Sequence, residues 1–152
     1  MPLSKPRPPI DPRGPRFSAA ITAALLLVTV FLSLVGASAS ALVLLTVLAG
    51  LFAWGAIAGA GRHPYGLLFK RFVRPRLAPP LELEDQAPPT FAQAVGLAVT
   101  LVGVVLGVVG IPEAVGAAAA VAFVAAFLNA VFDYCLGCQV YLLLVRARVI
   151  RA

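Results

Sequence analysis

The chain has 152 residues, of which 61% are hydrophobic and 12% are charged, and its formal net charge is +6. A soluble domain is roughly half apolar and about a quarter charged, and so short a chain cannot bury this much apolar surface in one core. The composition therefore excludes an ordinary soluble domain and indicates an integral membrane protein. A basic chain could also bind nucleic acid, but the positions of its charges argue against that class.

Residues 1–16, MPLSKPRPPIDPRGPR, are rich in proline. Proline at this density opposes helix and favours an extended chain, so we expect a proline-rich cytoplasmic arm that ends where the first apolar segment begins at Phe17. The arm carries Asp11, Arg13 and Arg16. We expect the two arginines to anchor the first span and to shape an anionic pocket.

Four apolar segments follow the arm. Residues 17–60 and 86–112 contain no Asp, Glu, Lys or Arg, and a bilayer core of about 30 Å needs about 20 apolar residues per helix. The sequence therefore predicts an all-α, four-helix transmembrane bundle over residues 17–152. The predicted spans are about 17–36, 41–60, 91–111 and 115–135.

The cytoplasmic link at 61–90 separates the second span from the third. Its first half, YGLLFKRFVRPRL, mixes aromatic residues and leucine with Lys and Arg, which predicts an interfacial helical segment near 65–74. Its second half, APPLELEDQAPP, is acidic and proline-rich. We expect that half to be an exposed, solvated strap.

The basic residues set the topology. All twelve Lys and Arg precede the first span, lie in the 61–90 link or follow the fourth span, and the other two links, ASAS and IPE, have none. The positive-inside rule then places the N-terminus and the C-terminus inside. The expected surroundings are a cytoplasmic membrane with anionic inner-leaflet headgroups, and no nucleic acid.

Glycines repeat along the second and third spans. Gly55 and Gly59 are four residues apart, as are Gly103 and Gly107. Small residues on one helix face let helices approach closely in lipid, and we favour this packing role. The alternative is a glycine-lined transport pathway.

The last apolar run, 114–145, is too long for one straight span. As a single helix it would measure about 48 Å, which exceeds what an ordinary tilt absorbs. We therefore expect it to bend, with Gly137 as the weak point, and to continue as an interfacial helical segment near 139–150.

Cys135 and Cys138 are the only cysteines and stand in a C-x-x-C pattern. On a reducing side such a pair more often binds metal or exchanges electrons than forms a structural disulfide. Zinc needs four ligands, and His63 is the only histidine, so we expect no metal and no cofactor. Thiol–disulfide exchange or persulfide transfer needs only the pair. Two merely packed thiols are an equally open alternative.

Asp133 lies two residues before the pair, and an ionisable group inside a span is costly enough to suggest a function. Asn129 is one helical turn earlier on the same face, so the two predict a polar stripe that leads to the cysteines. We favour an interhelical clamp between Asp133 and Arg16 or Arg62. The alternative is that Asp133 handles protons for the thiols.

Two motifs, IDPRGPRFSAAIT and CLGCQVY, resemble those of a family of small bacterial integral-membrane proteins, domain-of-unknown-function family 4395. The resemblance covers most of the chain and points to Asp11, Arg13 and Arg16 in the first motif and to Cys135, Gly137, Cys138 and Tyr141 in the second. The family has no established activity. Its association with thioredoxin-like and sulfurtransferase genes implies a thiol or sulfur relay.

The sequence thus favours a membrane-proximal dithiol that exchanges electrons or sulfur with a cytoplasmic thioredoxin-like or sulfurtransferase partner. Cys135, Cys138 and Asp133 are the candidate catalytic residues. One alternative is a small transporter or channel for a sulfur species, which would need a polar path through the bundle and favours a homo-oligomer. Another is a structural accessory subunit without chemistry.

Overall fold

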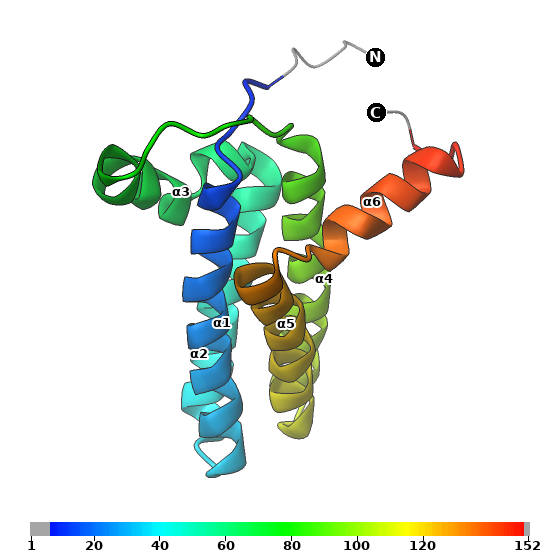
Figure 1. Cartoon of the computed structure of the whole chain (residues 1–152). Coiled ribbons are helices and arrows are strands. Elements are labelled where there is room, and N and C mark those ends of the chain that lie inside the picture. The colour runs from blue at the N-terminus through cyan, green and yellow to red at the C-terminus, as the bar shows by residue number, and fades with distance from the viewer. Residues whose placement is uncertain (1–6, 151–152) are drawn as a thin grey trace.

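The computed structural model describes residues 7–150 and is helical throughout (Figure 1). Four helices are long and apolar enough to cross a membrane: α1 (Arg13–Leu34), α2 (Ser38–Ala58), α4 (Ala87–Val108) and α5 (Glu113–Phe132). The described residues contain no strand, only one isolated antiparallel bridge between Ile10 and Glu84. The predicted all-α, four-helix transmembrane architecture is confirmed.

Two helical hairpins make up the bundle. Short turns join α1 to α2 and α4 to α5, and each turn uses a glycine with positive φ, Gly36 at 79° and Gly110 at 100°. Residues with side chains avoid this conformation, which explains glycine just past each helix end. Because α1 packs on α5 and α2 packs on α4, each helix of one hairpin has a partner in the other.

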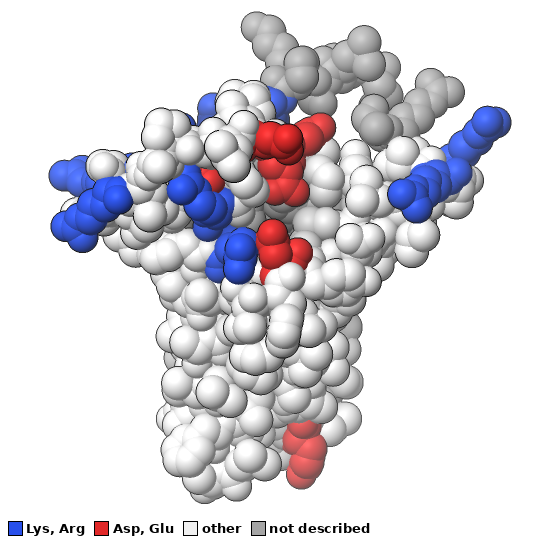
Figure 2. Space-filling model, in the orientation of Figure 1, with Lys and Arg blue, Asp and Glu red and all other residues white. Residues whose placement is uncertain are grey.

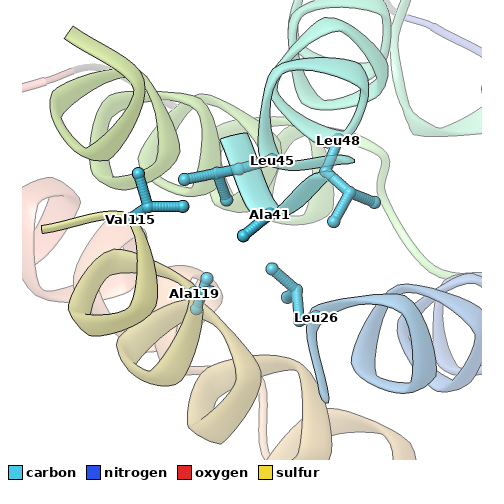
Figure 3. Packing of buried hydrophobic residues seen from close by; sticks show 7 residues of the cluster. Leu26, Ala41, Leu45, Leu48, Val115 and Ala119 are labelled. Atoms are coloured by element: carbon cyan, nitrogen blue, oxygen red, sulfur yellow. The ribbon is translucent and has the colours of Figure 1, made fainter. Parts of the chain in front are cut away.

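An apolar cluster fills the middle of the bundle (Figure 3). Gly107 lies so close to α5 that a Cβ there would be 2.5 Å from Cγ2 of Val115. At Gly96 a Cβ would be 2.5 Å from the Phe52 ring. These contacts support the packing role of the glycines. The buried cluster consists of Leu26, Ala41, Leu45, Leu48, Val115, Ala119 and Ala122.

The blue Lys and Arg side chains and most of the red acidic ones gather at one end of the bundle, and one acidic side chain lies at the other end (Figure 2). The link there forms short helical turns, η1 (Ala60–Arg62), α3 (Pro64–Leu68), η2 (Phe69–Val73) and η3 (Arg74–Arg76), and α6 (Leu136–Arg146) projects sideways from the same end (Figure 1). Both predicted helical segments are therefore present. Their position in a membrane interface, and the side of the membrane they face, remain predictions.

The described part of the arm, residues 7–12, packs back onto the protein. Helix α1 already begins at Arg13, ahead of the expected start at 17. Ile10 and Glu84 exchange backbone hydrogen bonds of 2.9 and 2.8 Å, and the Gln86 side chain donates to the Pro8 carbonyl. The acidic strap is thus paired along part of its length, where the sequence suggested a solvated loop. Residues 1–6 of the predicted arm lie outside the described residues.

Candidate functional site

The long last apolar run breaks at Asp133, and the predicted bend at Gly137 is wrong. Helix α5 ends at Phe132, and Asp133 adopts a left-handed conformation with φ 56° and ψ 29°. Aspartate tolerates this conformation because its short polar side chain can bond locally. Gly137 lies inside α6, where a Cβ would be 2.6 Å from Cα of Ala92 on α4. Its role is therefore close helix packing.

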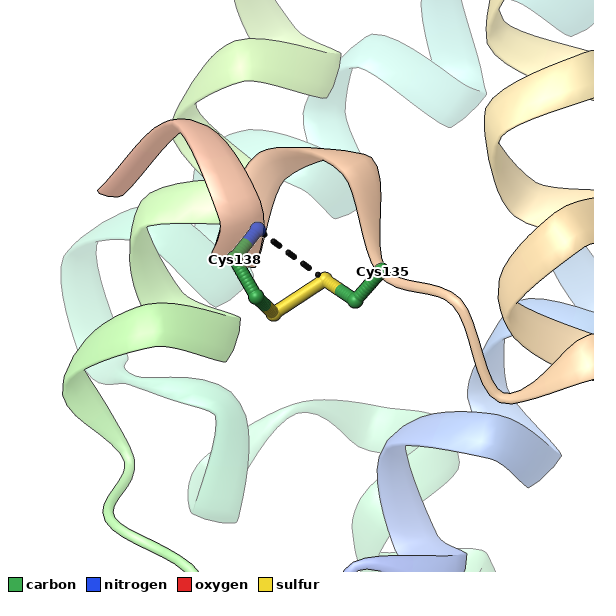
Figure 4. The surroundings of a disulfide bond; sticks show 2 residues. All are labelled: Cys135 and Cys138. Carbon is green, nitrogen blue, oxygen red and sulfur yellow. Dashed lines mark hydrogen bonds between the residues drawn. A yellow bond between two sulfur atoms is a disulfide. The ribbon is translucent and has the colours of Figure 1, made fainter. Parts of the chain in front are cut away.

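Cys135 and Cys138 form a disulfide at the start of α6 (Figure 4), with their Cα atoms 5.2 Å apart. Cys135 is the N-cap residue, and its Sγ accepts a 3.2 Å hydrogen bond from the Cys138 amide. Cys135 is partly exposed, whereas Cys138 is only 9% exposed. The positive end of a helix favours a thiolate. The outer sulfur therefore suits attack by a partner, and the inner sulfur suits resolution.

A cavity of about 380 Å³ adjoins the disulfide and is lined mainly by α1, α4, α5 and α6, with further contributions from α2 and the link. Asn129, Asp133, Cys135 and Cys138 all line it. The structure therefore brings the predicted polar stripe and the predicted cysteine pair to one hollow.

Asp133 also contacts α1. Its Oδ1 lies 3.6 Å from Nε of Arg16, and Arg16 donates to the Ala130 carbonyl at 3.3 Å. The Asp133 side chain is 65% exposed, and such exposed ion pairs contribute at most about 1 kcal/mol. Of the two arginines considered for the interhelical clamp, Arg16 is the one that contacts Asp133, and the contact is a weak ion pair. The proton-handling role of Asp133 stays a prediction.

Arg13 turns away from the cavity toward Asp11. Its guanidinium donates to both carboxylate oxygens of Asp11, at 3.0 and 2.8 Å, and to the Ala78 carbonyl at 2.9 Å. The hydrogen bonds from Arg13 lower the pKa of Asp11. This pair fastens the strap to the start of α1, and neither residue lines the cavity.

His63 and Tyr141 both make contacts that hold neighbouring segments together, and His63 also lines the cavity. His63 is 3% exposed, and its Nδ1 accepts a 3.3 Å hydrogen bond from the Tyr65 amide at the start of α3. Burial lowers the pKa of His63 and so favours the neutral imidazole. The Tyr141 ring packs against Phe91 at 5.7 Å and ties α6 to α4. Within residues 7–150 no three His, Cys, Asp or Glu side chains are grouped to hold a metal ion.

The cavity is also lined by polar residues that the sequence did not single out, and two of them have unusual surroundings. Glu84 reaches it from the strap, and burial, followed by the charges of Asp133 and Asp85, raises the pKa of Glu84. Gln93 reaches it from α4, and its Oε1 is buried without a hydrogen-bond partner among the described residues. The sequence could have indicated Gln93, because a polar amide inside an apolar span is unusual. It could not have indicated Glu84, because that residue reaches the cavity only when the strap is folded.

The model of the family described as Domain of unknown function (DUF4395) matches residues 10–146, so the chain belongs to that family. Neither a curated protein nor a solved structure matches the chain.

Proposed function

We propose that this member of the DUF4395 family is a membrane dithiol relay, in which Cys135 and Cys138 cycle between disulfide and dithiol. The observation that carries the proposal is the position of the pair. Cys135 caps the N-terminus of α6 and is partly exposed, and its disulfide partner Cys138 is buried. A polarised pair of this kind has one sulfur that a partner can attack and one that resolves the intermediate.

The exchange passes two electrons. A thiolate of a partner dithiol attacks Sγ of Cys135, which breaks the disulfide and releases Cys138 as a thiolate. The partner's second thiol, once deprotonated, then attacks the partner's first sulfur in the mixed disulfide. This step forms the partner's disulfide and releases Cys135 as a thiolate. The partner is then a disulfide and the relay a dithiol. The N-terminus of α6 stabilises the Cys135 thiolate, and Asp133 is the proposed carboxylate that exchanges protons with the thiols.

The proposed partner is a cytoplasmic protein of the thioredoxin-like or sulfurtransferase kind. The described Lys and Arg residues precede α1, lie in its first turn, follow α2 or follow α5 in the chain. The positive-inside rule assigns that end to the cytoplasm of a bacterial membrane. A sulfurtransferase would use the reduced relay. The Cys135 thiolate would take the outer sulfur of the partner's persulfide and release the partner's thiolate.

The transport alternative lacks support from the bundle. Two threonines, Thr29 and Thr100, are fully buried near the apolar cluster, and their hydroxyls bond to carbonyls of their own helices, Leu25 and Gly96. These two hydroxyls therefore do not extend the polar lining of the cavity through the described bundle. An accessory subunit without chemistry is the interpretation that remains if the thiols do not cycle.

Trapping of a mixed disulfide tests the proposal. The variants Cys138→Ser and Cys135→Ser each keep one thiol, which is activated as a thionitrobenzoate disulfide. Each variant then meets thioredoxin whose resolving cysteine is replaced by serine, and the covalent complex is followed on non-reducing gels. We expect Cys138→Ser to react at least about tenfold faster, because its remaining sulfur is the exposed one. Equal rates, or no complex with either variant, would refute the polarised relay.

A further inference from the structure

The cavity beside the disulfide extends from the charged end toward the lipid-facing side of the bundle. Its far wall includes Val99 on α4 and Val121 on α5, and Val121 is 61% exposed. The same two valines line a second, shallow apolar hollow on the outer side of α4 and α5. The two hollows therefore adjoin each other at these valines, between α4 and α5.

The walls of the cavity suit a small ring with polar edges. Phe52, Ala125 and Ala126 supply an apolar lining, and Asn129 and Gln93 add amide groups. The volume of about 380 Å³ is at the small end of the range of ligand pockets. A buried amide oxygen without a partner costs about 1–3 kcal/mol, and Oε1 of Gln93 is such an atom among the described residues. A ligand that donates a hydrogen bond to this oxygen would recover that cost.

We propose that the cavity binds the head group of a membrane-soluble quinone, with the chain of the quinone in the groove between α4 and α5, and that this quinone oxidises the Cys135–Cys138 dithiol. The inference rests on the proposed relay, since it supplies the acceptor for the relay's electrons. A quinone accepts two electrons and two protons, which is what a dithiol releases. Its ring matches the apolar walls, and its carbonyl oxygens can accept from the side-chain N–H groups of Gln93 and Asn129. The hydroxyls of the hydroquinone can donate to Oε1 of Gln93, and the chain of the quinone partitions into lipid.

The step balances without another reactant. The Cys135 thiolate adds to a ring carbon of the quinone and forms a carbon–sulfur bond. The Cys138 thiolate then attacks Sγ of Cys135, which forms the disulfide, breaks the carbon–sulfur bond and leaves the electron pair on the ring. The ring takes up the two protons that the thiols have lost and becomes the hydroquinone. Asp133 and Glu84 line the same cavity and can pass these protons.

Electron transfer is tested with the full chain in nanodiscs, reduced and kept without oxygen. Decylubiquinone, a benzoquinone with an alkyl chain, is added, and disulfide formation and quinone absorbance are followed together. We expect one disulfide per quinone reduced. Ala125→Phe fills the cavity and should slow the reaction by at least about tenfold. Val124→Phe alters the neighbouring residue, which is 53% exposed and does not line the cavity, and should leave the rate unchanged.

A binding experiment separates the site from the redox chemistry. The double variant Cys135→Ser, Cys138→Ser is irradiated with a photoreactive quinone analogue, and the labelled peptides are mapped. Labels on α4 and α5 at the cavity, displaced by decylubiquinone but not by added phospholipid, would support the inference. Labels elsewhere, or displacement by phospholipid as well, would overturn it.

The two proposals fail in different ways. A dithiol that exchanges with thioredoxin but is neither reoxidised nor labelled by the quinone overturns the quinone site and leaves the relay intact. Labelling at the cavity by a quinone, in a protein whose thiols never cycle, overturns both the relay and the electron transfer.

For Ala125→Phe, an unchanged rate of reduction by thioredoxin and an unchanged melting temperature show that the variant is folded. If Ala125→Phe and Val124→Phe are reoxidised equally fast, the cavity is not the quinone site.

Discussion

Replacing Gly137 by alanine tests whether the cysteine pair is positioned by contact between α6 and α4. The new Cβ would lie 2.6 Å from both Cα and Cβ of Ala92, whereas carbon atoms pack best at about 3.5–4.0 Å. Neither Ala92 atom can rotate away, so α6 has to move by about 1 Å. Overpacking costs about 1–3 kcal/mol, and the helix propensity of alanine returns up to about 1 kcal/mol. We therefore expect Gly137→Ala to lower the free energy of unfolding by about 1 kcal/mol.

The assay is reversible unfolding in mixed micelles, combined with the rate at which a maleimide labels Cys138 after reduction. We expect faster labelling in Gly137→Ala, because Cys138 is the next residue and the shift loosens its packing. Gly50→Ala is the matched control: a Cβ at Gly50 meets no described atom within 4 Å, so this variant should be as stable as the parent or up to about 1 kcal/mol more stable. If Gly137→Ala matches Gly50→Ala in both measurements, the contact does not position the cysteines.

Three further predictions concern the groups around the site. Asp133→Val should destabilise the protein by about 1–2 kcal/mol, because valine resists the left-handed conformation. Asp133→Asn removes the charge but tolerates this conformation, so it should leave the stability nearly unchanged. Chemical unfolding of both variants measures the two free energies of unfolding. Arg13 lowers the pKa of Asp11 from its ordinary 3.8. The pair therefore stabilises the fold above pH 3.8, and this stabilisation is lost as the pH falls through the lowered pKa. A series of melting temperatures at acid pH should show a weaker pH dependence in Asp11→Asn. Burial raises the pKa of Glu84 above 4.5. In this pH range the folded state therefore binds a proton that the unfolded state has lost, and stability falls as the pH rises from 4.5 through the raised pKa. Glu84→Gln should remove this fall in melting temperature, and a pH profile identical to that of the parent would contradict the prediction.

The spans could be predicted from the sequence because the charges leave three long charge-free runs, the first of which is long enough for two spans. The helices begin ahead of the predicted spans for a physical reason. Helix α4 begins at Ala87 and α1 at Arg13, and in both helices prolines follow within the first turn. Proline opposes helix in general, but the first turn needs no donor from its amide. The prolines that suggested loop are therefore part of the helix starts.

The candidate site was only partly readable. The close spacing of Asn129, Asp133 and the cysteines in the sequence predicted that they would line one surface, and all of them line the cavity. Residues this near in sequence also lie near one another in space. The break at Asp133 was missed because glycine is the commoner residue in a left-handed conformation, and Gly137 competed for that role. Glu84 was missed because it reaches the cavity through pairing of the strap with Ile10. Such a contact between distant segments leaves no local pattern.

Thiol accessibility in sealed inside-out vesicles tests the central claim most directly. A maleimide too large to cross the membrane is applied with and without prior reduction, and right-side-out vesicles serve as the control for orientation. The relay account predicts labelling of Cys135 in inside-out vesicles only, and only after reduction. Labelling in right-side-out vesicles would contradict the proposed orientation. Thiols that are already reduced, and that stay unlabelled even in detergent-loosened membranes, would contradict the exchange chemistry itself.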